Sequence, residues 1–157
     1  MATEQICSLP VGELDDENSV LFLWCTWPLL SDGFKVISAW GFDYITGMPW
    51  VKIVGRPKES LFGGLEIKPQ YGTGFWIRGC SEPLMIARKG KPEPCTRDFC
   101  GIISPNFQHS RKPENLYEMA ENCSPPYLEL FARREKRGWD CFGNEVDNSI
   151  VLGGAAF

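Results

Sequence analysis

Polar side chains follow two short apolar segments near the end of the chain. Arg133 comes just after YLELF (127–131), and Asn144 and Glu145 follow GWDCF (138–142). In open α/β sheets, ligands bind at the carboxyl ends of the strands, where an acidic or amide side chain commonly hydrogen-bonds a ribose. These residue types at this spacing predict a nucleoside-binding site. The alternative is that Asn144 belongs to a plain turn, since the segment has no G-x-G-x-x-G phosphate loop.

The segments that would position these side chains alternate between strand and helix patterns. Strands are indicated by apolar runs rich in β-branched and aromatic residues, and helices by apolar residues at helical spacing that follow a proline or precede a glycine. The predicted strands are residues 20–24, 44–54, 74–90, 127–131 and 138–142, and the predicted helices lie within residues 28–42 and 113–120. This alternation indicates an α/β domain with a mainly parallel sheet. The Gly- and Pro-rich connection at 55–74 is expected to be a mobile loop.

Composition places the chain among ordinary globular proteins. Its 157 residues are 43% apolar and 23% charged, so a single domain over residues 1–157 is expected, with a flexible tail at 147–157. No stretch reaches the roughly 18 apolar residues of a membrane span, and the N-terminus lacks a signal-peptide pattern, which predicts a location in the cytoplasm or nucleus. The seven cysteines are odd in number and scattered, which predicts reduced side chains. Cys95 and Cys100 are closely spaced, but without a second pair or a nearby histidine we expect no metal site.

The net charge of −4 averages over segments of opposite sign. An acidic cluster lies at residues 13–17, whereas residues 88–97 and 133–137 are basic. Basic segments of this size contact phosphate groups in some proteins and are solvated loops in others. The charge pattern therefore leaves nucleic acid open as a partner despite the acidic total.

A series of motifs extends the argument to nearly the whole chain. From about Ile6 to Val146 the sequence contains, in order, LPVGEL, VLFLWCTWPLL, AWGFDY, WVK, GTGFWIRGCSEPLMIARKGKP, SRKPENLY and PPYLELFARREKRGWDCFGNEV. In this order and spacing the chain resembles the adenine N-6 methyltransferases of phages and bacteria, which are relatives of the catalytic subunit of the eukaryotic mRNA adenosine methyltransferase. The resemblance implies a Rossmann-like fold that binds S-adenosylmethionine and transfers a methyl group to the exocyclic N-6 amine of adenine.

The resemblance also implies roles for individual side chains. The cofactor-binding positions that it implies are Lys112, Leu130, Phe131, Arg133, Asn144 and Glu145. The substrate-binding positions that it implies are Trp76, Glu82, Ser110 and Lys112. A solvent-exposed cap is the alternative for Lys112, and packing beneath the loop is the alternative for Trp76. His109 is better explained by a loop hydrogen bond than by general-base catalysis, because no partner is identifiable from its spacing.

The catalytic loop of that family is not identified in this chain. The lone pair of an adenine amine is delocalised into the ring, and the family uses a D-P-P-aromatic loop whose acceptors draw on the amine's hydrogens while the aromatic ring stacks on the base. The family places this loop upstream of LPVGEL. We therefore expect a fold that is incomplete at the N-terminus and lacks a central strand between residues 20–24 and 127–131. Alone, such a chain is expected to aggregate or to bind the cofactor weakly.

One local string, SPPY at residues 124–127, fits a looser consensus for the catalytic loop. It follows a predicted helix and enters a predicted strand, whereas the catalytic loop should follow the carboxyl end of a strand. We therefore expect SPPY to terminate the helix at the opposite edge of the sheet. No catalytic residue is predicted within the chain.

Three functions remain to be distinguished. The first is methylation of adenine in DNA, with RNA as the alternative nucleic acid, in the cytoplasm of a bacterial host cell. The second is a catalytically silent nucleic-acid-binding partner or a truncated remnant of such an enzyme. The third is an unrelated nucleotide-binding α/β protein. The expected partners are nucleic acid and further subunits of a homo- or hetero-oligomer, and no membrane is expected.

Overall fold

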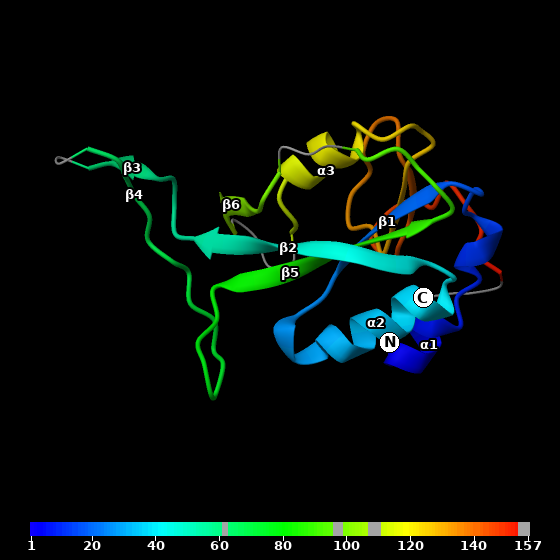
Figure 1. Cartoon of the computed structure of the whole chain (residues 1–157), viewed down its shortest axis with the longest axis horizontal. Coiled ribbons are helices and arrows are strands. Elements are labelled where there is room, and N and C mark those ends of the chain that lie inside the picture. The colour runs from blue at the N-terminus through cyan, green and yellow to red at the C-terminus, as the bar shows by residue number, and fades with distance from the viewer. Residues whose placement is uncertain (61–62, 96–98, 107–110, 154–157) are drawn as a thin grey trace.

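A four-stranded sheet forms the centre of the molecule (Figure 1). The computed structural model describes residues 1–60, 63–95, 99–106 and 111–153. In the order in which they lie side by side, the strands are β1 (Ser19–Trp24), β5 (Ser81–Lys89), β2 (Asp43–Ile53) and β6 (Ile102–Pro105). The helices are α1 (Thr3–Cys7), η1 (Val11–Glu13), η2 (Trp27–Leu29), α2 (Leu30–Ala39) and α3 (Asn115–Ala120). The remaining strands are β3 (Lys58–Glu59), β4 (Leu65–Glu66), β7 (Leu128–Leu130) and β8 (Asp140–Phe142).

The strand directions correct the prediction of a mainly parallel sheet. β5 runs antiparallel to both of its neighbours, β1 and β2, and only β2 and β6 run parallel within this sheet. A parallel neighbour requires a crossover connection, usually a helix, whereas the described chain between β2 and β5 contains no helix. The prediction was wrong because it extended the strand–helix–strand alternation to the whole sheet, although the connection between β2 and β5 has the Gly- and Pro-rich composition of turns. The coarser expectation of mixed α/β content holds.

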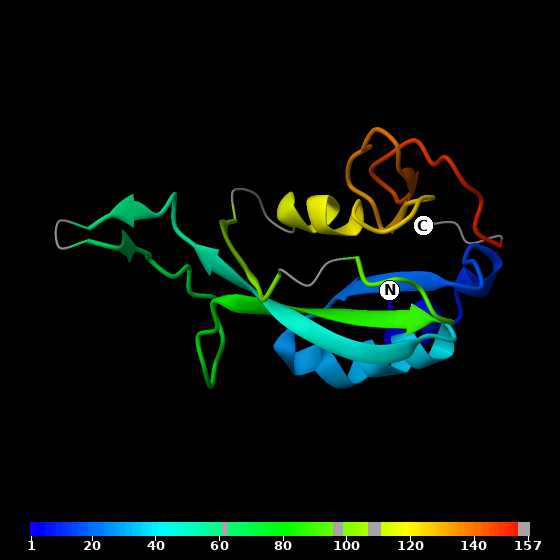
Figure 2. The same ribbon diagram turned by 45° about the horizontal axis from the view of Figure 1, so that its top comes forward.

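Helices α2 and α3 cover opposite faces of the sheet (Figure 2). Side chains alternate across a strand, so neighbouring residues of β5 point to opposite sides. Met85 and Ala87 pack in one core cluster with Val36 of α2, whereas Leu84 packs in a second cluster with Met119 of α3. The two helices therefore build two cores on one sheet.

The predicted helices are present, with shifted ends. The first begins at Leu30, within the segment 28–42 whose apolar spacing predicted it, and it ends as predicted before Gly41, whose φ of 79° is a left-handed conformation that favours glycine. The second begins at Asn115, two residues after Pro113. None of the helices in the described parts of the chain is long and apolar enough to cross a bilayer.

Strands β7 and β8 form a separate parallel pair. Their side chains Leu130 and Phe142 pack into the same core cluster as α2. The segment where a flexible tail is predicted returns to this core, since Leu152 is only 1% exposed within it. Among the described strands, β1 pairs only with β5 and β7 only with β8, so each has one edge without a strand partner.

The cysteines correct a second prediction. Cys95 and Cys123 form a disulfide, with their Cα atoms 4.5 Å apart. The prediction of seven reduced side chains was wrong because the two residues are 28 apart in the sequence, and no local pattern shows that the chain after α3 returns to the segment after β5. Among the described residues, no group of three or more His, Cys, Asp or Glu side chains is placed to hold a metal ion.

The connection between β2 and β5 projects from the end of the sheet (Figure 1). We call residues 54–80, apart from 61 and 62, the arm. It contains the β3–β4 hairpin and a second turn, closed by a 2.8 Å hydrogen bond from the N–H of Gly72 to the C=O of Gly79. The base of the arm is attached to β2, because Lys52 donates its N–H to the C=O of Cys80 at 2.7 Å and accepts from the N–H of Gln70 at 2.9 Å.

Candidate functional site

The carboxyl ends of β7 and β8 meet at Ala132 and Gly143. The N–H of Ala132 donates to the C=O of Phe142 at 3.1 Å, which continues the parallel pairing beyond the strands. A Cβ atom on Gly143 would overlap the backbone oxygen of Ala132 and would lie 2.7 Å from its nitrogen. Only glycine therefore allows the two exits to approach so closely. Arg133 and Asn144, the next residues along the two segments, leave the strands side by side.

The predicted cofactor residues Asn144 and Glu145 line one shallow depression, and Arg133 lies beside it in contact with Glu145. Nε of Arg133 is 3.6 Å from Oε1 of Glu145, and the two side chains are 54% and 51% exposed. The residues that line the depression, which has a volume of about 500 Å³, are Arg134, Glu135, Asn144, Glu145, Val146 and Asp147. Carboxylate and amide acceptors beside guanidinium donors are suited to sugar hydroxyls and to carboxylates. The volume lies within the range of small-ligand sites.

Leu130 and Phe131 occupy the end of β7 that leads to this depression. Leu130 is half-buried against the core, whereas Phe131 has a φ of 60°. A left-handed conformation is rare for a bulky residue and is held in place only by the surrounding structure. Such strained positions are concentrated at binding sites. The strain at Phe131 therefore marks the turn from β7 toward Arg133 as a position worth testing for ligand contact.

The segment after β8 fixes the exit that carries Asn144. The N–H of Gly143 donates to Oδ1 of Asn148 at 2.7 Å, and the N–H of Cys141 donates to Oγ of Ser149 at 2.9 Å. Asn148 and Ser149 lie in the segment where a flexible tail is predicted, and no role is predicted for them from the sequence. The sequence could have indicated a role for them, because short polar side chains often accept hydrogen bonds from the backbone of a nearby turn.

A second group of predicted residues meets at Glu82. Oε1 of Glu82 is 2.5 Å from Nζ of Lys52, and Oε2 is 2.6 Å from Nζ of Lys112. Glu82 lies in β5 opposite Trp50 of β2, and Lys52 lies two residues further along β2, on the same face as Trp50. The side chains of Glu82 and Lys112 are only 18% and 29% exposed. The alternative of a solvent-exposed cap is therefore wrong for Lys112.

Aromatic rings surround this lysine–glutamate cluster of Lys52, Glu82 and Lys112. Nζ of Lys52 is 4.9 Å from the centre of the Trp50 ring, and Nζ of Lys112 is 5.2 Å from the centre of the Trp24 ring. Burial by itself raises the pKa of Glu82. The hydrogen bonds and charges of Lys112 and Lys52 outweigh burial, so the pKa of Glu82 lies below its ordinary value.

Two neighbouring groups complete the surroundings of the cluster. The indole N–H of Trp24 is buried and has no hydrogen-bond partner among the described residues. Burial raises the pKa of the Cys25 thiol, and the charge of Glu82 adds to this effect, so the thiol stays protonated near neutral pH. The site thus offers N–H donors from Lys52 and Lys112 beside aromatic faces, an arrangement suited to a planar ligand with hydrogen-bond acceptors.

The other predicted substrate positions are not part of this cluster in the described structure. Trp76 is 92% exposed in the second turn of the arm, so the alternative of packing beneath the loop is also wrong. Ser110 and His109 lie outside the described residues. The SPPY string at 124–127 lies between α3 and β7 as predicted, at the amino end of the strand rather than at its carboxyl end.

A polar network joins α3 to the turn between β7 and β8. The hydroxyl of Tyr117 donates to Oε2 of Glu129 at 2.8 Å, and Nη2 of Arg134 is 2.6 Å from Oε1 of Glu114. The ring of Trp139 packs edge-on against Tyr117, with centres 5.1 Å apart. Burial, followed by the contact with Glu129, raises the pKa of Tyr117 to about 12, and burial raises the pKa of Glu129. These contacts hold the turn that follows β7.

We expect Tyr117→Phe to lower the free energy of unfolding by about 1–2 kcal/mol at neutral pH, because Glu129 loses a buried hydrogen-bond donor. The folded-state pKa of Glu129 is already raised. Protonated Glu129 therefore stabilises the folded state below the unfolded-state pKa, and this stabilisation is lost as pH rises through the folded-state pKa. The Tyr117 hydroxyl lowers that pKa. Without it the pKa rises further, so the penalty grows as pH rises above the unfolded-state pKa of about 4.3, which urea unfolding at a series of pH values would measure.

Tyr44→Phe is the matched control, because the Tyr44 hydroxyl has no hydrogen-bond partner within the parts of the chain that the structure describes. We expect this control to change the free energy of unfolding by less than about 0.5 kcal/mol. Equal effects of the two variants, or a Tyr117→Phe penalty independent of pH, would contradict the role given to the Tyr117–Glu129 bond.

Lys52 is the member of the lysine–glutamate cluster that the sequence analysis did not predict. It lies within the motif WVK, inside an otherwise apolar strand. A signal was present, because a residue two positions after Trp50 in a strand must share its face. A lone charge on such a face requires a partner, which indicates an ion pair within the sheet.

The fold and the depression define an α/β protein with a candidate ligand site at the carboxyl ends of two parallel strands. The MT-A70 family model matches residues 1–145. The chain is 29% identical over 162 residues to "N(6)-adenosine-methyltransferase subunit METTL3" of Danio rerio, a match that covers 92% of this chain and 26% of the relative. It is 30% identical over 151 residues to "Putative N(6)-adenosine-methyltransferase MT-A70-like" of Medicago truncatula, with 93% and 23% covered.

A bacterial relative is covered more fully. The chain is 28% identical over 156 residues to "Type II methyltransferase M.MunI" of Mycoplasma sp, with 95% of this chain and 60% of the relative covered. This chain belongs to the MT-A70 family of methyltransferases, and its resemblance to N-6 adenine methyltransferases is confirmed. It spans about a quarter of the length of the curated eukaryotic relatives given above. An unrelated nucleotide-binding protein, the third function considered, is excluded by this membership.

Proposed function

We propose that this chain is part of an S-adenosylmethionine-dependent methyltransferase with a Rossmann-like fold that modifies the exocyclic N-6 amine of adenine in DNA. Family membership supports the reaction class. The structural observation that carries the proposal is the gathering of Arg133, Asn144 and Glu145 where β7 and β8 end. This is the edge at which open α/β sheets hold nucleosides.

The donors and acceptors at the depression fit S-adenosylmethionine. The ribose has hydroxyl groups for which the carboxylate of Glu145 and the amide of Asn144 are acceptors, and the methionine carboxylate matches the guanidinium of Arg133. Arg133 and Glu145 are half-exposed and 3.6 Å apart, so both can turn toward a ligand at little cost. Leu130 and Phe131 would supply the apolar wall. When bound, this cofactor supplies an electrophilic methyl group on a sulfonium.

We assign the target adenine to the lysine–glutamate cluster. Ring nitrogens of a purine accept hydrogen bonds, and Lys52 and Lys112 have N–H groups beyond those given to Glu82. Glu82 itself is a weak base, because two ammonium groups hold its pKa below the ordinary value. In this proposal Glu82 orients the two lysines and takes no proton. By the resemblance, Ser110 and Trp76 also belong to the substrate side, and the acceptors for the amine's hydrogens belong to a D-P-P-aromatic loop.

DNA is proposed over RNA on the resemblance to phage and bacterial enzymes, and the relative named as a type II methyltransferase supports this choice. The proposed location is the cytoplasm of a bacterial host cell, and assembly with further subunits is compatible with a relative named as a subunit. The alternative function is a catalytically silent partner that binds nucleic acid.

Two measurements test the proposed function. Titration of the chain with S-adenosylmethionine is expected to show weak, saturable binding that S-adenosylhomocysteine displaces. Methyl transfer to adenine-containing duplex DNA is expected when an Asp-Pro-Pro-Trp segment is added upstream of the chain. Cofactor binding without any transfer by the extended chain would favour the silent partner. If neither the chain nor the extended chain bound S-adenosylmethionine, the proposal would be contradicted.

A further inference from the structure

The second turn of the arm exposes three consecutive apolar side chains. Phe75, Trp76 and Ile77 are 97%, 92% and 81% exposed, and the rings of Phe75 and Trp76 meet edge-on with centres 6.1 Å apart. Single exposed apolar residues are common on proteins, whereas a run of three large ones at a projecting tip is typical of a binding surface.

The turn that carries this tip has a defined shape. A Cβ atom on Gly74 would overlap the backbone oxygen of Ile77, so only glycine allows the chain to fold back so tightly. Below the tip, the N–H of Gly72 bonds the C=O of Gly79, and Nε of Arg78 donates to the C=O of Gly72 at 3.1 Å. The tip is therefore presented on a hydrogen-bonded stem rather than on an unstructured loop.

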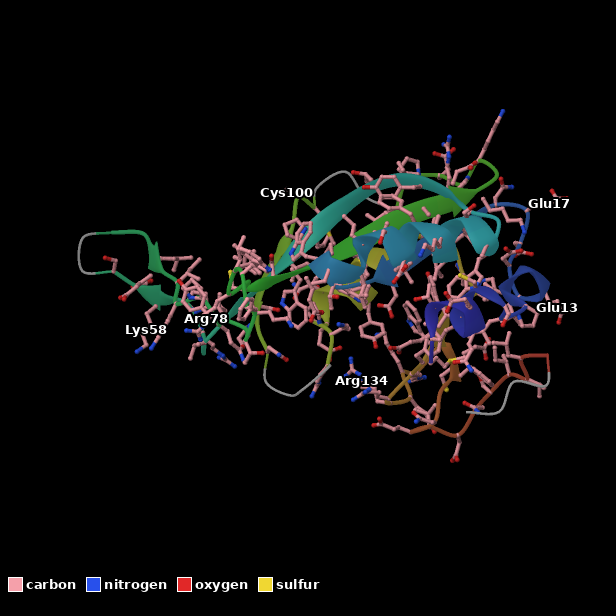
Figure 3. The ribbon with its side chains drawn as sticks, turned by 90° about the horizontal axis from the view of Figure 1, so that it is seen from below. Glu13, Glu17, Lys58, Arg78, Cys100 and Arg134 are labelled. Carbon is pink, nitrogen blue, oxygen red and sulfur yellow. A yellow bond between two sulfur atoms is a disulfide. The ribbon has the colours of Figure 1, made fainter. Side chains whose placement is uncertain are left out.

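The arm is basic in a chain that is acidic overall. It carries four basic residues, Arg56, Lys58, Lys68 and Arg78, and two acidic ones, whereas the whole chain has a net charge of −4. None of these four cations forms an ion pair with a described residue, although eight other lysines and arginines do. Figure 3 shows Lys58 and Arg78 at the end of the molecule opposite the acidic Glu13 and Glu17.

The arm is attached next to the lysine–glutamate cluster. Its stem is hydrogen-bonded to the backbone of Lys52, whose side chain holds Glu82. Trp76 lies four residues before Cys80, so at most roughly 14 Å of extended chain separates the tip from the attachment point. A strand of nucleic acid held by the tip would therefore pass close to the cluster that we assign to the target adenine.

We propose that the arm is a nucleic-acid clamp in which Phe75 and Trp76 stack on bases while Arg56, Lys58, Lys68 and Arg78 contact the flanking phosphates. Aromatic side chains stack on bases of any sequence, and unpaired cations beside them match the phosphate backbone. The same side chains can fill the space that an extruded base leaves in a duplex. This inference deepens the proposed function, because it assigns the chain a surface that holds the nucleic acid.

The test compares two variants of the full chain by fluorescence anisotropy with labelled single-stranded DNA, duplex DNA and RNA. Phe75→Ala with Trp76→Ala is expected to raise the dissociation constant about tenfold or more and to leave its salt dependence unchanged. Lys58→Gln with Arg78→Gln is expected to weaken binding mainly at low salt, and to reduce the slope of log affinity against log salt by about 1–2. The nucleic acid that shows the largest effect of the aromatic variant identifies the preferred form.

Val151→Ala is the matched control, because Val151 is also exposed but lies outside the arm. It is expected to leave the affinity unchanged, and the aromatic variant and this control are expected to keep the melting temperature of the parent chain, since their altered side chains are exposed. Unchanged nucleic-acid affinity of the aromatic variant, or no binding by the parent chain, would overturn the clamp. The clamp would also be overturned if the aromatic variant kept its nucleic-acid affinity but lost self-association in sedimentation. The tip would then be a contact between copies of the chain. Because binding is measured without cofactor, failure of methyl transfer contradicts the proposed function alone.

Discussion

Glu82→Gln is expected to lower the free energy of unfolding by about 2 kcal/mol, and the melting temperature by about 5 °C, at neutral pH. The substitution keeps the shape of the side chain but leaves Lys52 and Lys112 facing each other without a counter-charge. Each now lies within 2.6 Å of one carboxylate oxygen of Glu82. Partial exposure of the three side chains keeps the penalty below that of a fully buried pair.

The pH dependence of this penalty follows from the depressed pKa of Glu82. A group whose folded-state pKa is lowered stabilises the protein above its unfolded pKa of about 4.3, and this stabilisation is lost as pH falls through the folded-state pKa. The difference between Glu82→Gln and the parent chain should therefore narrow below about pH 4. Urea unfolding over this pH range would measure it.

Two comparisons make the Glu82 result specific. Glu66→Gln, on the exposed strand β4, is expected to change the free energy of unfolding by less than about 0.5 kcal/mol. Adding Lys52→Met to Glu82→Gln is expected to recover part of the lost stability, because it removes the repulsion between the lysines. If the double variant lost as much free energy of unfolding as Glu82→Gln and Lys52→Met lose separately when added together, the lysine–glutamate cluster would not be energetically coupled.

Gly143→Ala is expected to destabilise the chain by about 2–3 kcal/mol and to weaken S-adenosylmethionine binding more than tenfold. The added methyl group would collide with backbone atoms of Ala132, which cannot move aside as a flexible side chain can. The ends of β7 and β8 must separate to accommodate it, and Arg133 and Asn144 would separate with them. Urea unfolding and a cofactor titration would measure the two effects.

Gly12→Ala is the control for this substitution. A Cβ atom at Gly12 meets nothing within 4 Å, so we expect a change of less than about 0.5 kcal/mol and unchanged cofactor affinity. If Gly143→Ala behaved like Gly12→Ala, the close approach of the two strand exits would not be needed for either stability or binding.

The strand-end site could be predicted because its parts are close together in the sequence. Arg133 and Glu145 are separated by one turn and one short strand, so local patterns are enough to place them at neighbouring strand ends. The contact between Glu82 and Lys112 spans 30 residues, and only the family resemblance pointed to both residues. Lys52 was missed because a single lysine in a strand does not identify its partner.

Long-range pairing explains the predictions that failed. Whether β5 runs parallel or antiparallel to β1 and β2 depends on the path of the arm, which local propensities do not determine. The disulfide between Cys95 and Cys123 likewise depends on where α3 lies relative to β5. The sequence after residue 146 has no helix or strand pattern, so nothing in it distinguished the buried Leu152 from its exposed neighbour Val151.

The central claim is that side chains beyond β7 and β8 bind the sugar of S-adenosylmethionine. The most direct test is an NMR titration of the chain with this cofactor, comparing the double variant Asn144→Ala with Glu145→Ala against the matched surface pair Asn122→Ala with Glu118→Ala on α3 and the turn after it. We predict that the first pair raises the dissociation constant about tenfold or more, since two hydrogen bonds of about 1 kcal/mol each are lost, and that the second pair leaves it unchanged. Equal dissociation constants for the two pairs would contradict the account.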